Sequence, residues 1–339
     1  MLDALLSKLT RREDLTPEES AAAMGEIMDG RASDAAIAAL LMGLVMKGER
    51  PAEIVGLARA MRDRAKDPAL ARPGLVDMCG TGGDGAGTFN ISSVAALVVA
   101  GCGVPVAKHG NRAASSRCGS ADLFEALGVP LSVPPEAVER VLDHAGLAFL
   151  FAPVFHPSMR NAAPVRRALG LRTAFNLLGP LTNPARPSRQ IVGVPRPEQT
   201  ELIARALLLL GSERAWVVHA ADGIDELSTT GYTKVSECRD GAVNTFYLHP
   251  SECGLPTAPA GALRGGDAGE NAAIASAVLA GERGPARDVV LFNAAAALLV
   301  AGAAGTLTGG LRLAAAAVDS GRANEVLQRL AARSRELAA

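Results

Sequence analysis

A run of glycines between residues 80 and 87 is the part of the sequence best suited to chemistry. It follows an apolar stretch, 75–79, that predicts a buried strand. Asn90 and Ser92 come next, just before an apolar run, 94–100, that is typical of a helix. A strand, a glycine loop and a helix N-terminus together present backbone N–H groups and a helix dipole to one point. The sequence therefore predicts a phosphate-binding loop.

Better-known glycine motifs fit this loop poorly. Gly80, Gly82 and Gly85 have the spacing of the dinucleotide fingerprint, which also requires an acidic residue about twenty positions later. A cation, Lys108, stands there instead, so a dinucleotide-dependent oxidoreductase is the last of the alternatives. A Walker A loop is excluded because Thr88 stands where that motif requires lysine.

A second polar cluster follows a predicted strand at 103–107. It reads Lys-His-Gly-Asn-Arg over 108–112 and continues through several serines to Asp122. Such side chains also bind anions, and the cluster lies close to the glycine loop in the sequence. Two anion-binding loops predict a ligand with more than one phosphate group.

Two further segments carry charged residues in patterns that favour ligand binding. Five arginines lie between residues 160 and 186, and an arginine fork binds carboxylates and phosphates bidentately. For any one of them a solvated helix face is the alternative. Asp225 and Glu226 follow a predicted strand at 215–219, where α/β enzymes place ligand-handling groups. They could hold Mg²⁺ or simply cap a helix.

The elements that must position these groups follow two patterns. Residues 1–70 predict helices, one of which starts at Thr16 with Pro17 in its first position. From residue 75, β-like runs alternate with helical runs, which predicts an α/β domain with a parallel sheet. The predicted strands are 75–79, 103–107, 147–151, 190–194, 215–219 and 243–248.

Composition narrows the function classes. The 339 residues predict about two domains, and the net charge of −1 and aromatic content of 3% give no case for nucleic-acid or membrane-surface binding. The five cysteines form no C-x-x-C pair, so zinc is not indicated and reduced thiols are expected. The N-terminus lacks the pattern of a signal peptide, and we expect a cytoplasmic protein.

Several motifs, in fixed order, resemble the anthranilate phosphoribosyltransferase family. They are Gly80–Asp84, Asn90–Ser92, Lys108–Arg112, Arg172–Leu181 and Asp225–Glu226. The resemblance implies a small all-helical domain, 1–71 with a returning segment near 160–187, and a large α/β domain, 72–339, with a mainly parallel central sheet. It also implies a homodimer joined through the helical domains.

The resemblance implies transfer of a phosphoribosyl group from phosphoribosyl pyrophosphate to the amine of anthranilate, in tryptophan biosynthesis. It assigns the donor to Gly80, Gly82, Gly83, Asp84, Thr88, Asn90, Ser92, Lys108, Asn111 and Ser120. It assigns anthranilate to Gly80, His109, Asn111, His156, Arg166 and Pro180. It assigns two Mg²⁺ ions per subunit to Ser92, Asp225 and Glu226. Because histidine titrates near neutral pH, His109 is the candidate that accepts or relays the amine proton.

Two other functions are weighed against the transferase. A pyrimidine nucleoside phosphorylase has a similar fold and a Lys-His loop, but it would need neither the arginine-bearing segment nor a metal-binding carboxylate pair. A non-catalytic binding protein of this fold would have lost the motifs and gained a basic patch. The motifs are intact and the charge is near zero, which favours the enzyme.

Overall fold

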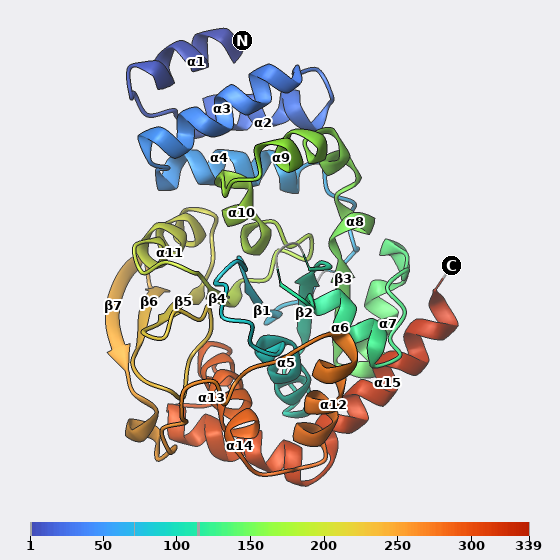
Figure 1. Ribbon diagram of the computed structural model, residues 1–339. Helices are drawn as coiled ribbons and strands as arrows, with labels where there is room; N and C mark the ends of the chain where they lie inside the picture. Colours follow the sequence, from blue (N-terminus) through green and yellow to red (C-terminus); the bar gives the residue numbers. More distant parts are fainter. Residues whose placement is uncertain (1, 71, 114–115, 339) are drawn as a thin grey trace.

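The computed structural model describes residues 2–70, 72–113 and 116–338 (Figure 1). The chain begins with a helical bundle of α1 (Leu2–Thr10), α2 (Pro17–Met28), α3 (Asp34–Lys47) and α4 (Pro51–Arg62). The predicted helix start at Thr16 is confirmed. The Thr16 hydroxyl accepts a hydrogen bond from the Glu19 N–H at 3.2 Å, and the Glu19 carboxylate accepts one from the Thr16 N–H at 2.9 Å.

A segment from the middle of the chain packs on this bundle. It contains α8 (Ala152–Phe155), α9 (Ala163–Leu169) and α10 (Ala174–Leu178), and α9 contacts α3 while α10 contacts α4 (Figure 1). Val165 and Phe175 lie in the same apolar cluster as Ile37 and Ile54 of the bundle. Residues distant in sequence therefore share one core here, and the domain boundary at 71/72 with its returning segment stays a prediction.

The α/β part is built on one seven-stranded sheet of order β3-β2-β1-β4-β5-β6-β7. The strands are β1 (Val76–Gly80), β2 (Val106–Gly110), β3 (Leu147–Phe151), β4 (Arg189–Gly193), β5 (Arg214–Ala220), β6 (Thr233–Arg239) and β7 (Ala242–Leu248). The first five in this order run parallel, β6 pairs antiparallel with β5, and β7 pairs antiparallel with β6. The expected class, an α/β domain with a mainly parallel sheet, is confirmed.

Helices cover both faces of the sheet. On one side lie α5 (Ile91–Gly101), α13 (Pro285–Val300), α14 (Leu307–Asp319) and α15 (Arg322–Leu337), and α11 (Gln199–Leu209) packs on β5, β6 and β7 from the other (Figure 1). The strands are buried on both faces, since Ile191 and Trp216 belong to one apolar cluster while Val192 and Val217 belong to the other. The helical bundle joins the second cluster through α4 and α11. The remaining α-helices of the described residues are α6 (Ser120–Ala126), α7 (Val138–Ala145) and α12 (Ala268–Leu279).

Two strand predictions need correction. The strand expected at 103–107 is placed too early, because β2 runs from Val106 to Gly110 and pairs with β3 along that length. Lys108 and His109 therefore belong to a strand and not to the loop after it. The sequence does not indicate strand β6 (Thr233–Arg239), because its polar residues are also typical of a loop, and the strand forms by pairing with β5 on one side and β7 on the other. Among the described residues, no helix combines the length and apolarity needed to cross a membrane.

Candidate active site

The glycine loop lies where the strand order of the sheet reverses. The chain moves from β1 outward to β2 and β3, then returns to place β4 on the other side of β1. In open α/β sheets, ligands bind outside the carboxyl ends of the strands at this switch point. Both strands end there in glycine, β1 at Gly80 and β4 at Gly193.

Asp225 explains why both strands end in glycine. A β-carbon at Gly80 would lie 2.4 Å from the Asp225 Oδ2 atom, and one at Gly193 would lie 1.6 Å from the Asp225 carbonyl oxygen. The same Oδ2 atom accepts a hydrogen bond from the Gly82 N–H at 3.0 Å. The loop after β5 is thus seated across the ends of β1 and β4, with its carboxylate against the glycine loop.

Glu226 extends this contact to the start of α5. Its Oε1 atom accepts a hydrogen bond from the Ser92 N–H at 3.1 Å. Burial, then the nearby Asp84, raises the pKa of Asp225 to about 7, and burial, then Asp225, raises the pKa of Glu226 to about 8. Lys108 opposes the second shift. Burial thus disfavours the ionised form of both carboxyls, and a bound cation would offset that cost.

The described residues contain no ready-made cage of three or more His, Cys, Asp or Glu side chains. That is compatible with Mg²⁺, which usually binds one or two carboxylates and completes its shell with water and substrate phosphates. Ser92 contacts Glu226, which follows Asp225 in the chain, and their donor set of carboxylates and a hydroxyl fits this ion. The assignment of these three residues to the metal stays a prediction.

A buried asparagine fixes the Asp225–Glu226 loop. Asn293 of α13 is wholly buried and accepts a hydrogen bond from the Leu227 N–H at 3.1 Å. Its amide also donates to the Leu227 carbonyl at 2.8 Å and to the Val289 carbonyl at 2.9 Å. The carboxylate pair is therefore held by a helix of the C-terminal region, a contact that the sequence did not indicate.

Lys108 lies deeper than a loop residue would. It is almost fully buried in β2, and its Nζ atom donates to the carbonyl oxygen of Met78 in β1. Burial raises the pKa of both Glu226 and Asp77, and the Lys108 ammonium opposes this rise without cancelling it in either group. Its assignment to the donor stays a prediction.

Asp77 is a residue of this region that sequence reasoning missed. Its buried carboxylate accepts hydrogen bonds from the Asn183 amide at 2.9 Å and from the His109 N–H at 3.3 Å. It thus ties β1 to β2 and to the end of the returning segment. In the sequence, the feature that indicates its role is its position inside the apolar run 75–79. A carboxylate that is buried there needs hydrogen-bond partners.

The second polar loop packs beside the glycine loop. The Asn90 amide donates to the Cys118 carbonyl at 3.1 Å, and the Ser120 hydroxyl donates to the Asn111 carbonyl at 3.4 Å. Thr88 forms an isolated antiparallel bridge with Arg264. The Asn90–Cys118 bond thus joins the end of the glycine loop to the second polar loop, in which residues 114 and 115 lie outside the described ranges. The assignment of both loops to the donor stays a prediction.

Two histidines form the other half of the site. The rings of His109 and His156 lie 5.2 Å apart, and both Nε2 atoms are buried without a hydrogen-bond partner among the described residues. Burial lowers the pKa of His109 to about 3 and that of His156 to about 4, so both rings are neutral at pH 7. A ring with so low a pKa is a weak general base, which favours a positioning role for His109.

Arg166 and Arg172 approach this region from the returning segment. The Arg166 guanidinium lies 5.2 Å from the centre of the Phe175 ring, and it makes no ion pair or side-chain hydrogen bond with another described residue. The Arg172 Nη2 atom is buried and also lacks a hydrogen-bond partner among them. Pro180, later in the same segment, is also buried. Its carbonyl oxygen accepts a hydrogen bond from the Gln190 amide at 2.9 Å. Arg166 is thus a guanidinium free to bind a carboxylate.

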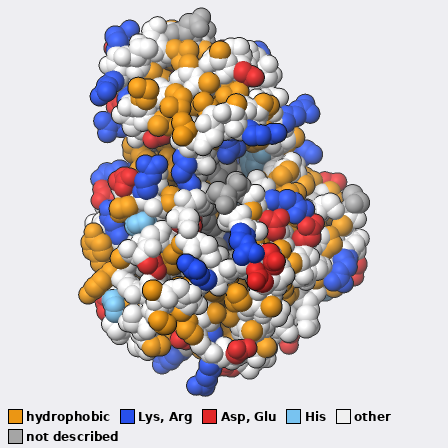
Figure 2. All heavy atoms as spheres, viewed as in Figure 1, with side chains coloured by type: hydrophobic (Ala, Val, Ile, Leu, Met, Phe, Trp, Pro, Cys, Tyr) orange, Lys and Arg blue, Asp and Glu red, His pale blue; other side chains and the backbone are white. Residues whose placement is uncertain are grey.

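The surface is hollowed between the helical bundle and the α/β domain, and lysine and arginine side chains gather around this hollow (Figure 2). Its upper side carries the returning segment and its lower side the ends of the sheet strands (Figure 1). The arrangement places the glycine loop and the second polar loop opposite a wall that carries the Arg166 guanidinium and two neutral imidazoles.

Comparison with known proteins agrees with this arrangement. Residues 3–65 match the helical bundle domain of a glycosyl transferase family, and residues 72–324 match the a/b domain of the same family. An anthranilate phosphoribosyltransferase of Moorella thermoacetica is 56% identical over 332 residues, covering 98% of each chain.

Solved structures show the same likeness. The crystal structure of anthranilate phosphoribosyltransferase from Thermus thermophilus matches with a TM-score of 0.92 and 47% identity, covering 97% of this chain and 99% of that one. The enzyme from Saccharomyces cerevisiae in complex with PRPP and Mg matches with a TM-score of 0.90 and 28% identity, over 99% and 98% of the two chains. The chain therefore belongs to this glycosyl transferase family and, within it, to the anthranilate phosphoribosyltransferases.

Proposed function

We propose that the protein transfers the phosphoribosyl group of phosphoribosyl pyrophosphate to the amine of anthranilate and releases pyrophosphate. The reaction would take place in the cleft between the helical bundle and the α/β domain. The observation that carries the proposal is the Asp225–Glu226 pair, which contacts the glycine loop through Gly82 and the start of α5 through Ser92. Backbone N–H groups for phosphate and carboxylates for a cation converge there, as a donor with a diphosphate and a monophosphate requires.

The donor side comprises the two polar loops. Gly80, Gly82, Gly83, Asp84, Thr88, Asn90, Ser92, Lys108, Asn111 and Ser120 are the residues assigned to it. Ser92, Asp225 and Glu226 would hold Mg²⁺, with two ions per subunit. When bound, the metal neutralises charge on the departing pyrophosphate. The loop N–H groups and the α5 N-terminus act on the same charge, which makes leaving-group stabilisation the main contribution of the chain.

The acceptor side is the wall formed by the returning segment and β2. Arg166 binds the anthranilate carboxylate, while Gly80, His109, Asn111, His156 and Pro180 surround the ring. The arylamine is neutral at pH 7, so it needs alignment more than deprotonation. The low pKa values of both histidines support a role in shaping the pocket and accepting hydrogen bonds.

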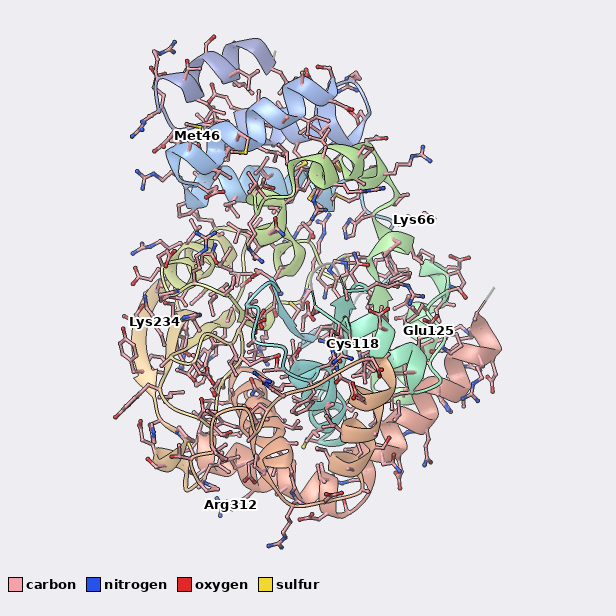
Figure 3. All side chains as sticks on the ribbon, in the orientation of Figure 1. Met46, Lys66, Cys118, Glu125, Lys234 and Arg312 are labelled. Carbon is pink, nitrogen blue, oxygen red and sulfur yellow. The ribbon has the colours of Figure 1, made fainter. Side chains whose placement is uncertain are left out.

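We also propose a homodimer joined through the helical bundles, in the cytoplasm. Met46 of α3 (labelled in Figure 3) is 73% exposed and its neighbour Val45 is 37% exposed, which leaves apolar surface on the bundle for a second copy. All five cysteines are free, as expected in a reducing compartment.

The test is an assay of the purified protein with anthranilate, phosphoribosyl pyrophosphate and Mg²⁺, followed by the loss of anthranilate fluorescence. Loss that needs both the donor and the metal supports the proposal. Phosphorolysis of uridine or thymidine without any loss of anthranilate would favour a pyrimidine nucleoside phosphorylase instead.

A further inference from the structure

A segment that leads into α12 lies beside the end of the glycine loop. Residues 263–271, called here the strap, run beside residues 87–90. The Gly265 N–H donates to the Gly87 carbonyl at 2.9 Å, and the Phe89 N–H donates to the Leu263 carbonyl at 3.2 Å. Gly265 must be glycine because a β-carbon there would lie 2.6 Å from the Phe89 Cα atom. The strap therefore fixes the end of the loop from which Asn90 projects.

A chain of three hydrogen bonds runs from the strap through Asn90 to the second loop. The Gly266 N–H donates to Asn271 Oδ1 at 2.7 Å, and Asn271 Nδ2 donates to Asn90 Oδ1 at 2.9 Å. Asn90 Nδ2 then donates to the carbonyl of Cys118, which precedes α6 (labelled in Figure 3), at 3.1 Å.

Both ends of this chain are backbone groups, and they fix its direction. A backbone N–H can only donate and a carbonyl can only accept, so neither amide can rotate by 180° without opposing two like groups. The Oδ1 atom of Asn90 also accepts from the Cys118 thiol at 3.2 Å. The Asn90 oxygen is therefore occupied, while the second hydrogen on Nδ2 has no partner among the described residues.

We propose that Asn271 is a positioning residue for the phosphoribosyl donor. It is 1% exposed and acts through Asn90, holding that amide so that the group left for a ligand is an N–H and not an oxygen. An N–H favours a phosphate oxygen, whereas an amide oxygen in the same place would repel it. The chain also links the strap to both anion-binding loops, so Asn271 sets their spacing. This inference rests on the proposed function.

Asn271→Asp tests the direction of the chain because it changes one group with little change of shape. The new oxygen faces Asn90 Oδ1, which forces Asn90 to turn or leaves two acceptors opposed. We expect the KM for phosphoribosyl pyrophosphate to rise about tenfold or more, as for a buried polar group without its partner. The KM for anthranilate should stay within about twofold of the wild-type value. Asn271→Ala removes the bond without repulsion and should give a smaller rise in the same KM.

Asp267→Ala is the matched control. Asp267 caps the same helix, α12, by accepting from the Glu270 N–H at 2.9 Å, but it does not contact Asn90. Its loss should lower thermal stability and leave the donor KM unchanged. Equal donor KM shifts in Asn271→Asp and Asp267→Ala, or equal shifts for both substrates in Asn271→Asp, would overturn the inference. If Asn271→Asp does not fold, the test uses folded Asn271→Ala. A donor KM for that variant equal to the wild-type value would also overturn the inference. An inactive wild-type enzyme would instead refute the proposed function.

Discussion

The guanidinium of Arg172 lies directly against the backbone of Gly83, where a β-carbon would come 1.6 Å from the Nη1 atom. Arg172 comes from the returning segment and Gly83 from the glycine loop. This contact joins the acceptor wall of the cleft to the donor floor. Burial lowers the pKa of Arg172, while Asp225 and Asp84 raise it, so the guanidinium lies among the charges of the site.

Gly83→Ala should lower kcat/KM by more than the strain of an alanine at positive φ can explain. Gly83 has a φ of 76°, and the new methyl group would also displace Arg172. Gly85→Ala is the control, because Gly85 has a similar φ of 71° and open space around it. Each variant should lose about 1–2 kcal/mol of stability from left-handed strain. We expect kcat/KM to fall at least about tenfold further for Gly83→Ala, and equal falls would show that the contact has no role.

Arg166→Ala should raise the KM for anthranilate about tenfold or more with little effect on the donor KM. The reason is that a free guanidinium contributes a charge-assisted pair to a carboxylate. Arg167→Ala, which removes the exposed neighbouring arginine, should leave both constants unchanged. Steady-state kinetics with each substrate varied in turn measures this, and equal effects of Arg166→Ala on both KM values would remove Arg166 from the carboxylate role.

The Asp225→Asn, Glu226→Gln double variant should lose metal-dependent turnover and gain stability at high pH. The folded pKa values of about 7 and about 8 lie above the ordinary carboxyl values, so the folded state binds more protons than the unfolded state. Wild-type stability is therefore lost as the pH rises toward 8.

Without metal at pH 8.5, the Tm of the double variant should exceed that of the wild type by about 2 °C or more. At pH 4, where the wild-type carboxyls are protonated, this advantage should vanish. Magnesium titrations of turnover check the first effect. A titration curve like that of the wild type would show that the pair only caps the following segment.

Acid should destabilise the protein through His109 and His156. Their folded pKa values of about 3 and about 4 lie below the ordinary value of 6.5, so the unfolded state binds more protons between these limits. Stability is therefore lost as the pH falls below 6.5, by about 1.4 kcal/mol per pH unit for each ring once the unfolded histidine is fully charged.

The His109→Gln, His156→Gln double variant should lose less stability than the wild type between pH 6 and pH 4.5, as measured by urea unfolding. His144→Gln, at an exposed position on α7, should follow the wild-type curve. If the stability of all three proteins fell in parallel with pH, the rings of His109 and His156 would not be both buried and neutral in the folded state.

The sequence alone determined the features that depend on neighbouring residues. The helix start at Thr16, the strand before Gly80 and the glycine loop all follow from contacts within a few residues. The order of the motifs also indicated the fold class, and Asp225 and Glu226 are neighbours in the chain itself. These predictions succeeded because turn, capping and strand preferences are local, and because adjacent residues remain adjacent after folding.

Tertiary structure decided everything that joins distant segments. The sequence did not show that β6 exists, that Lys108 is buried in a strand, or that Asn183 bonds to Asp77. It also did not show Arg172 against Gly83 or Asn271 against Asn90, residues 181 positions apart. The physical reason is that the role of a buried polar side chain depends on its hydrogen-bond partner. These partners come into contact only when the sheet and its covering helices assemble.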